Sequence, residues 1–198
     1  MSKIEDNEAF VREVQAVLGV GVDGHAGPRT VSAWRAKEGV AAGSSPSSVI
    51  PDSYWPMLSK IESGDRPYVK ASTSSASGLY QFIRATWIAE GGQWGSDMSK
   101  AFGGLKPSPE EQLRRARSFT EKNANVLRKA GIPINNASLY SAHFLGAGTA
   151  VKALEGAVTD RIAEHVGLAA IQANPSILKG TVGDFLTWLH RKTGFWAK

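Results

Sequence analysis

Apolar residues recur at helical spacing along most of the chain, and no long segment alternates between apolar and polar residues as a half-buried strand would. Tyr54, Leu58 and Ile61 fall on one helix face, and Gly64 follows them as a stop signal. Further helices are predicted at about 137–156, 158–173 and 181–193. We therefore predict an all-α fold with at most one small β-hairpin around residues 66–80, where Tyr-Val-Lys favours a strand.

The clearest helix signal begins at Ser108. Ser108 and Glu111 have the spacing of a capping box, Pro109 suits the first helical position, and Gly131 can end the helix. The stripe that we expect to face the core consists of Leu113, Ala116, Phe119, Val126, Leu127 and Ala130.

A Ser- and Pro-rich stretch at residues 41–51, AAGSSPSSVIP, contains too little apolar surface to order itself. We predict that it links an N-terminal module at residues 1–40 to a main domain at residues 52–198. The module should hold two short helices, the first ending at Gly19 and the second beginning at Pro28.

The composition narrows the chemistry. The chain of 198 residues has no cysteine, which excludes disulfides, thiolate nucleophiles and cysteine-based zinc sites. Its four histidines lie far apart without metal-ligand spacing, so we expect neither a metal nor another cofactor. The net charge of +5 is uneven: residues 1–50 carry five basic and six acidic side chains, and residues 51–198 carry eighteen and twelve. A basic main domain favours an anionic partner, such as nucleic acid, a membrane surface or an acidic cell wall.

The N-terminal sequence MSKIEDNEAF lacks the basic and then apolar pattern of a signal peptide. No run of about 18 apolar residues suggests a membrane span. We expect the chain to be made in the cytoplasm, without stable membrane association. Work outside the cytoplasm would require a separate component that permeabilises the membrane.

Glu62 is the most promising catalytic carboxylate. It follows Leu58 and Ile61 at the edge of an apolar stripe, at the C-terminal end of a predicted helix. Burial and the helix dipole should both raise its pKa. A glutamic acid that stays protonated near neutral pH can act as general acid on a glycosidic oxygen. A solvated glutamate at a helix end is the alternative interpretation.

The segment SASGLYQF follows at residues 75–82. Gly78 permits backbone conformations closed to other residues and lets a ligand approach closely, and Gln81 offers a donor and an acceptor for acetamido or hydroxyl groups. An ordinary junction between a loop and a helix is the alternative. The residues of this segment that we expect at a ligand site are Ser75, Ser77, Gly78, Leu79, Tyr80 and Gln81.

The pair Glu62-Ser63 and the Gly-Leu-Tyr-Gln segment at residues 78–81 resemble two motifs of the soluble lytic transglycosylase domain, which belongs to the goose-type lysozyme superfamily. The resemblance covers roughly residues 52–155. It implies a lysozyme-like fold in which the glutamate is the sole catalytic acid and base. It also implies that Ser63 and residues 78–81 line the sugar cleft.

A third motif of that family, close to Ala-Tyr-Asn-Ala-Gly, is replaced here by SLYSAHFLGAGTAV. Phe144 stands where the family has Tyr, and Leu145 where it has Asn. The resemblance implies that the family tyrosine steadies the glutamate or the substrate, a role that Tyr140 or His143 could take over here. Tyr140, His143 and Phe144 are therefore expected at the substrate site.

In the N-terminal module, VREVQAVLGVGVDGHAGPRTVSAW resembles the peptidoglycan-binding repeat, Gln-x-x-Leu-Gly-x-x-Val-Asp-Gly-x-x-Gly-Pro-x-Thr. The resemblance implies a cell-wall-binding module, and a structural helix-turn-helix appendage is the alternative. The matching residues that we expect to bind the wall are Gln15, Asp23, Gly24, Gly27, Pro28 and Thr30.

Both resemblances concern the same polymer, and together they are similar to a modular bacteriophage endolysin. They imply an antimicrobial, cytolytic enzyme that acts as a monomer in the periplasm and cleaves the MurNAc-β-1,4-GlcNAc bond of peptidoglycan. We expect a lytic transglycosylase that forms 1,6-anhydroMurNAc. A hydrolytic muramidase would need a second carboxylate to activate water, and the candidates are Asp65, Glu90 and Asp97.

Other classes of function stay open. A non-catalytic wall-binding or virion structural protein would keep the fold without the activity. A nucleic-acid-binding protein could use Arg114, Arg115 and Arg117, but such a cluster also suits the solvated face of a helix, and we expect no nucleic-acid partner. The C-terminal TWLHRKTGFWAK is cationic and aromatic and could disturb a membrane, although Trp188 and Trp196 are expected to be core or capping residues.

Overall fold

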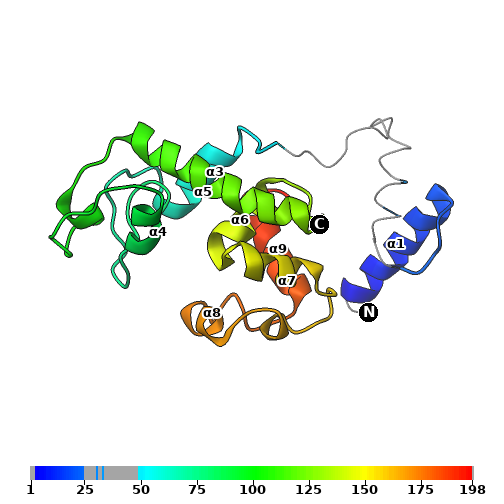
Figure 1. Ribbon diagram of the computed structural model, residues 1–198. Coiled ribbons are helices and arrows are strands. Elements are labelled where there is room, and N and C mark those ends of the chain that lie inside the picture. The colour runs from blue at the N-terminus through cyan, green and yellow to red at the C-terminus, as the bar shows by residue number, and fades with distance from the viewer. Residues whose placement is uncertain (1–2, 25–29, 31–32, 34–48, 198) are drawn as a thin grey trace. The chain divides into compact units, whose positions relative to one another are not determined.

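The computed structural model describes residues 3–24, 30, 33 and 49–197 (Figure 1). The chain divides into two compact units, Met1–Ser45 and Pro46–Lys198. This division falls within the predicted linker at residues 41–51, most of which lies outside the described residues.

In the first unit, α1 runs over Lys3–Leu18. Gly19 ends this helix as predicted: its φ is 68°, and its N–H donates to a carbonyl in the last turn. Of the predicted second helix, Thr30 and Ala33 are helical, and Pro28 lies outside the described residues. The described part of the unit is therefore α1, the turn that follows it, and two helical residues of the predicted second helix.

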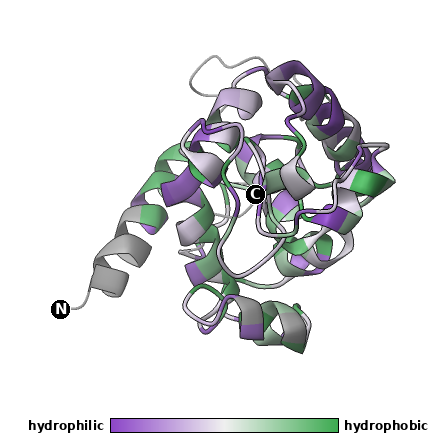
Figure 2. Ribbon diagram, turned by 90° about the vertical axis from the view of Figure 1, so that its left-hand side faces the viewer, coloured by the Kyte–Doolittle hydropathy of each residue, from purple (hydrophilic) through white to green (hydrophobic). Residues whose placement is uncertain are grey.

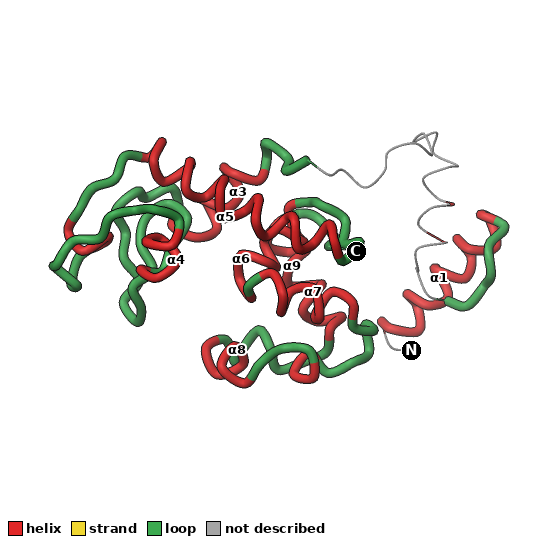
Figure 3. The backbone as a smooth tube through the Cα atoms, viewed as in Figure 1, coloured by secondary structure: helices red, strands yellow, loops and turns green. Residues whose placement is uncertain are grey.

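The second unit consists of α-helices joined by loops and by two short 3₁₀ turns (Figure 3). Its helices are α3 Tyr54–Ser63, α4 Arg84–Ala89, α5 Pro109–Lys129, α6 Asn136–Leu145, α7 Ala147–Glu155, α8 Leu168–Ala173 and α9 Val182–Thr193, and its 3₁₀ turns are η1 Ala101–Gly104 and η2 Ile162–Glu164. No strand occurs among the residues that the structure describes, so the prediction of a mainly helical protein is confirmed. None of the described helices is long and apolar enough to cross a membrane.

The hairpin expected around residues 66–80 is present only as isolated antiparallel bridges, which join Lys70 to Ser77 and Ser77 to Phe82. The N–H of Gly78 donates to the Val69 carbonyl at 2.8 Å. Because each pairing is a single bridge, the segment is a folded loop held by backbone hydrogen bonds.

Two of the predicted helices are interrupted. The helix expected at 137–156 breaks at Gly146, whose backbone (φ 79°, ψ 144°) separates α6 from α7. The segment 158–173 forms only η2 and α8, because Gly167 is extended between them (φ −71°, ψ 153°). The prediction for 181–193 agrees with α9.

The helix α5 begins at Pro109 as predicted, and Ser108 Oγ accepts a hydrogen bond from the Glu111 N–H at 3.2 Å. The Glu111 carboxylate instead pairs with Arg115 at 3.2 Å, so only half of the expected capping box forms. Val126 was wrongly predicted to be buried and is 41% exposed, because the face of α5 that meets the core is rotated away from it. That face includes the buried polar residues Gln112, Thr120 and Asn123.

The core of the second unit forms around α6, which packs against α5, α7 and α9. Every residue from Asn136 to Ala142 is buried, and the small Ala and Ser side chains among them let neighbouring helices approach closely. Figure 2 shows both hydrophobic and hydrophilic residues along most of the helices, as expected for helices that cover a core on one side. Large side chains such as Trp87, Phe102 and Phe185 fill this core, and each contributes about 1.5–3 kcal/mol by burial.

Candidate functional site

Glu62 lies in the last turn of α3. Gly64 ends this helix in the left-handed conformation, and its N–H donates to the Lys60 carbonyl at 3.2 Å. Asp65 follows with a φ of 61°, so two successive left-handed residues turn the chain sharply away from the helix. This local sequence places Glu62 at a helix end, while the rest of α3 is anchored in the core.

The Glu62 carboxyl is largely buried, with 18% of its side chain exposed. Burial raises the pKa of Glu62 and outweighs two contributions that lower it. The first is a hydrogen bond from the Tyr140 hydroxyl, and the second is the positive charge of Lys192. Glu62 therefore keeps its proton to a higher pH than an exposed glutamate does. When Glu62 is ionised, the Tyr140 hydroxyl donates a hydrogen bond to its carboxylate.

Tyr140 and His143 lie one turn apart on α6, with their rings stacked at a centroid distance of 6.4 Å. His143 Nε2 is 4.0 Å from Glu62 Oε1, which is too long for a hydrogen bond. Burial lowers the pKa of His143 to about 4, so the imidazole is neutral near neutral pH and forms no ion pair with Glu62. The backbone of Tyr80 has the opposite effect and raises the pKa of His143, but burial has the larger effect. The Nδ1 atom of His143 has no hydrogen-bond partner within the described part of the chain.

Aromatic side chains from two other helices surround this pair. Trp188 of α9 lies 5.8 Å from Tyr140 and 4.9 Å from Phe144, measured between ring centroids. Phe119 of α5 meets His143 edge to face at 6.1 Å. Phe144 therefore packs against α9, and Tyr140, one turn earlier in α6, is the aromatic residue that reaches the glutamate.

The Gly-Leu-Tyr-Gln loop is held in place by Gln112, a buried residue of α5. Gln112 Oε1 accepts a hydrogen bond from the Leu79 N–H at 2.8 Å. Its Nε2 donates to the carbonyls of Pro67 and Pro107, each at 3.0 Å. Gln112 was not among the residues expected at the site, although its position four residues before Ala116 on the predicted core stripe was an available signal.

Gly78 serves packing within the protein. Its φ is 78°, and a Cβ at this position would lie 2.3 Å from Gln112 Oε1 and 2.4 Å from Phe102 Cζ. The expectation that this glycine leaves room for a ligand is therefore wrong, because protein atoms occupy the space. Only a residue without a side chain fits there.

Two of the serines expected to contact a sugar are turned inward. Ser77 is fully buried, and its hydroxyl donates to the Ser75 carbonyl at 2.9 Å and accepts from the Phe102 N–H at 3.2 Å. Ser63 is also buried, and its hydroxyl donates to a carbonyl one turn earlier in α3. Both hydroxyls therefore form hydrogen bonds inside the protein, and the expectation that Ser63 and Ser77 contact a sugar is wrong. Ser75 is half-buried, and its hydroxyl accepts from the Arg84 N–H at the start of α4.

The remaining residues of the loop anchor and shape it. Tyr80 is buried and Leu79 is half-buried. Gln81 has a φ of 46°, a backbone conformation that costs a residue with a side chain about 1–2 kcal/mol. The Gln81 Nε2 and backbone N–H both donate to the Gly78 carbonyl, at 3.0 and 3.3 Å, and these bonds stabilise the strained turn.

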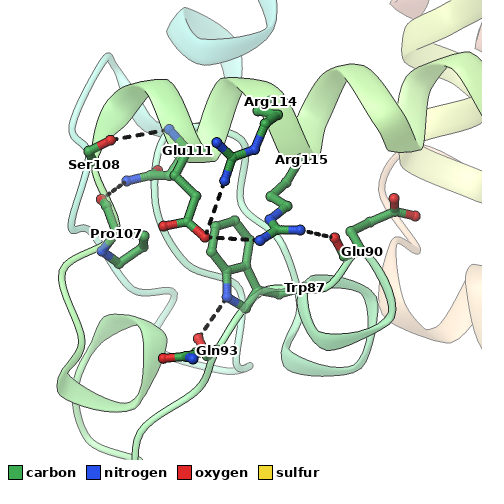
Figure 4. Close-up of polar contacts among 9 residues, drawn as sticks. Trp87, Glu90, Gln93, Pro107, Ser108, Glu111, Arg114 and Arg115 are labelled. Carbon is green, nitrogen blue, oxygen red and sulfur yellow. Dashed lines mark hydrogen bonds and ion pairs between the residues drawn. The ribbon is translucent and has the colours of Figure 1, made fainter.

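Glu90, a candidate for activating water, belongs to a polar cluster that joins the end of α4 to α5 (Figure 4). Its side chain is 5% exposed and pairs with Lys122 at 2.8 Å, and it also accepts a hydrogen bond from Ser118. Its backbone carbonyl accepts from Arg115, which in turn pairs with Glu111. Glu90 therefore links the end of α4 to α5 through its carboxylate and its backbone carbonyl.

Asp65 and Asp97, the other two candidates, also have partners of their own. Asp65 accepts a hydrogen bond from the Ser59 hydroxyl at 2.7 Å. Hydrogen bonds from Ser99 and Lys100 lower the pKa of Asp97 to about 2, which makes it a poor base. Each of the three carboxylates therefore already has a hydrogen-bond or ion-pair partner other than Glu62.

The residues expected to bind the cell wall meet around the buried side chain of Gln15 in α1. Its Nε2 donates to Asp23 Oδ1 at 2.7 Å and to Thr30 Oγ1 at 2.9 Å, and its Oε1 accepts from the Gly24 N–H at 2.9 Å. These hydrogen bonds join the turn to the helix, so the side chains of Gln15, Asp23 and Thr30 stabilise the unit itself. The other two expected residues, which lie outside the described residues, are Gly27 and Pro28.

Among the described residues, no group of three or more His, Cys, Asp or Glu side chains could hold a metal ion. A surface cavity of about 350 Å³ lies near the end of α7 and includes none of the expected site residues. The residues that line it are Lys152, Glu155, Gly156, Ala157, Asp160, Glu164 and His165.

A comparison of the chain with protein-family models found no match. The geometry around Glu62 provides one carboxyl that retains a proton, one hydroxyl that stabilises the carboxylate, and one neutral imidazole nearby.

Proposed function

We propose that this protein cleaves the MurNAc-β-1,4-GlcNAc bond of bacterial peptidoglycan, with Glu62 as the single acid and base. The observation that carries the proposal is the buried Glu62 carboxyl with its raised pKa beside the Tyr140 hydroxyl. A catalytic acid must hold a proton when the substrate binds and must be stable as an anion after giving it up. Burial supports the first state, and the hydrogen bond from Tyr140 supports the second.

The reaction is an intramolecular transfer. Glu62 donates its proton to the glycosidic oxygen as the bond from that oxygen to the MurNAc anomeric carbon breaks. The Glu62 carboxylate then accepts the proton of the MurNAc 6-hydroxyl, whose oxygen bonds the anomeric carbon and closes a 1,6-anhydro ring. Glu62 regains its proton, and no water is consumed. The separate partners of Asp65, Glu90 and Asp97 support this route over hydrolysis.

The same proposal includes a lysozyme-like fold for residues 52–198 and a role as an endolysin that reaches the wall after membrane permeabilisation. The Glu-Ser helix end, the Gly-Leu-Tyr-Gln loop and the buried α6 support the fold. The excess of basic residues in 51–198 would attract the anionic peptide stems of peptidoglycan. Residues 1–40 would add wall binding through surfaces other than the inward-facing Gln15 network.

Mass spectrometry of the products from purified peptidoglycan tests the proposal. Wild type should release muropeptides that are lighter by one water than hydrolysis products and that resist borohydride reduction. Glu62→Gln should release none, while the matched control Asp97→Asn should retain activity because its carboxylate only holds a loop. Reducible products ending in MurNAc would identify a muramidase instead. No product from wild type would refute the enzymatic proposal and favour a binding protein.

A further inference from the structure

The end of α9 carries aromatic residues beyond those that surround Glu62, although the charge of Lys192 in its last turn also acts on the Glu62 carboxyl. Gly194, with a φ of 75°, ends the helix, and its N–H donates to the His190 carbonyl at 2.8 Å. The next two residues, Phe195 and Trp196, are 47% and 54% exposed. Trp196 was expected to be a core or capping residue, and its exposure shows that it is not a core residue.

These two aromatic residues are held outward by ordered neighbours. The buried Thr193 hydroxyl donates to a carbonyl within α9 at 2.8 Å and accepts from the Phe195 N–H at 3.2 Å. The Trp196 ring stacks on His190 at a centroid distance of 4.3 Å. Ala197, directly after it, is fully buried. Two consecutive aromatic side chains that are held in exposed positions form apolar surface that a partner could cover.

Two cationic residues precede these aromatic residues in the chain. Arg191 and Lys192 occupy the last turn of α9, and both are exposed. Within the described part of the chain, no ion pair is formed by Arg191 or Lys192, and the charge of Lys192 also acts on the Glu62 carboxyl. Exposed cations beside exposed aromatic rings are typical of proteins that lie at the surface of an anionic bilayer.

We propose that Arg191, Lys192, Phe195 and Trp196, here called the C-terminal patch, dock onto an anionic phospholipid bilayer. The rings enter the headgroup region, which tryptophan favours, and the two cations face the negative lipid surface. The excess of basic residues in 51–198 adds a longer-range attraction. This inference does not depend on the proposed cleavage.

The same features argue against a sugar as the occupant. Phe195, the neighbour of Trp196, adds apolar surface without hydrogen-bonding groups, and a sugar would leave its hydroxyl groups unpaired there. Two rings and two cations give weak, reversible and salt-sensitive attachment rather than insertion. This agrees with the expectation of no stable membrane association.

Co-sedimentation of the full chain with vesicles tests the proposal. Wild type should bind vesicles that contain phosphatidylglycerol, should not bind pure phosphatidylcholine, and should lose binding as salt rises. The double variant Phe195→Ser, Trp196→Ser should bind roughly tenfold or more weakly, since both rings lose their burial in the bilayer. Arg191→Gln should bind about fivefold more weakly.

Two matched controls remove similar groups elsewhere. Leu168→Ser deletes an exposed leucine from α8, and Lys129→Gln deletes an exposed cation from the last turn of α5. Both should bind vesicles as wild type does. If the controls and the patch variants bind equally, the C-terminal patch is not the docking surface.

Tryptophan fluorescence provides a second readout, with circular dichroism as the check that each variant is folded. Trp196 is the most exposed of the described tryptophans, so vesicles should shift its emission to shorter wavelength, and Trp196→Ser should lose the shift. Binding to insoluble peptidoglycan is measured in parallel. If the patch variants lose wall binding while vesicle binding is unchanged, the patch recognises the wall and the lipid proposal is overturned.

Discussion

Replacing Gly78 with alanine tests whether packing fixes the Gly-Leu-Tyr-Gln loop. The new Cβ would lie 2.3 Å from Gln112 Oε1 and 2.4 Å from Phe102 Cζ, well inside van der Waals contact. Gln112 and Phe102 are each only 1% exposed, so neither can move without disturbing the core.

The expected loss of stability has two parts. The left-handed backbone at Gly78 costs an alanine about 1–2 kcal/mol. Overpacking against Gln112 and Phe102 adds about 1–3 kcal/mol. Gly78→Ala should therefore lower the free energy of unfolding by about 2–5 kcal/mol.

Gly131→Ala is the matched control, because its φ is 70° and no atom lies within 4 Å of the position that a Cβ would take. It should lose only the backbone part, about 1–2 kcal/mol. Urea unfolding followed by near-ultraviolet circular dichroism measures both variants, with a common slope for the comparison. Equal losses for the two variants would refute the reasoning, since the contacts around Gly78 would then impose no constraint.

Three further predictions concern polar side chains. Tyr140→Phe removes a hydrogen bond that stabilises the Glu62 carboxylate, so the pKa of Glu62 should rise and the alkaline limb of the pH–rate profile should move to higher pH; a limb that stays in place would contradict the hydrogen bond. Burial lowers the pKa of His143 from 6.5 to about 4, so the unfolded chain binds a proton that the folded chain excludes. The free energy of unfolding should therefore fall as pH falls through that window, and His143→Gln should flatten the fall in urea titrations. Gln15→Ala should destabilise the first unit by about 1–3 kcal/mol and speed hydrogen exchange at the Gly24 amide; unchanged protection there would show that the network is dispensable.

The helix ends that the sequence predicted depend on interactions within one turn. Pro109 and Ser108 start α5, and Gly64 and Gly19 end their helices in the expected left-handed conformation. The burial of Val126 was predicted wrongly, because which face of a helix meets the core depends on its neighbours. For the same reason, one predicted helix became α6 and α7, where a turn at Gly146 lets both pack against α5.

In the candidate site too, some features could be predicted from the sequence and others depend on tertiary packing. The sequence pointed to Glu62, Tyr140 and His143, and the structure brings these three side chains together. The sequence could not predict that Trp188 and Lys192 of α9 would lie near these side chains. The local pattern of α9 contains no information about its packing partners.

By itself, the sequence determined where most helices begin and end and which carboxyl stands at a helix end, since capping and stop signals act over three or four residues. Only the tertiary structure decided how the polar side chains are used. The side chains of Ser77 and Gln15 form hydrogen bonds inside the protein, whereas Trp196 is exposed and follows two cationic residues in the chain. Burial and hydrogen-bond partners come from segments that are distant in the chain, and their effects on pKa and exposure exist only after those segments have packed.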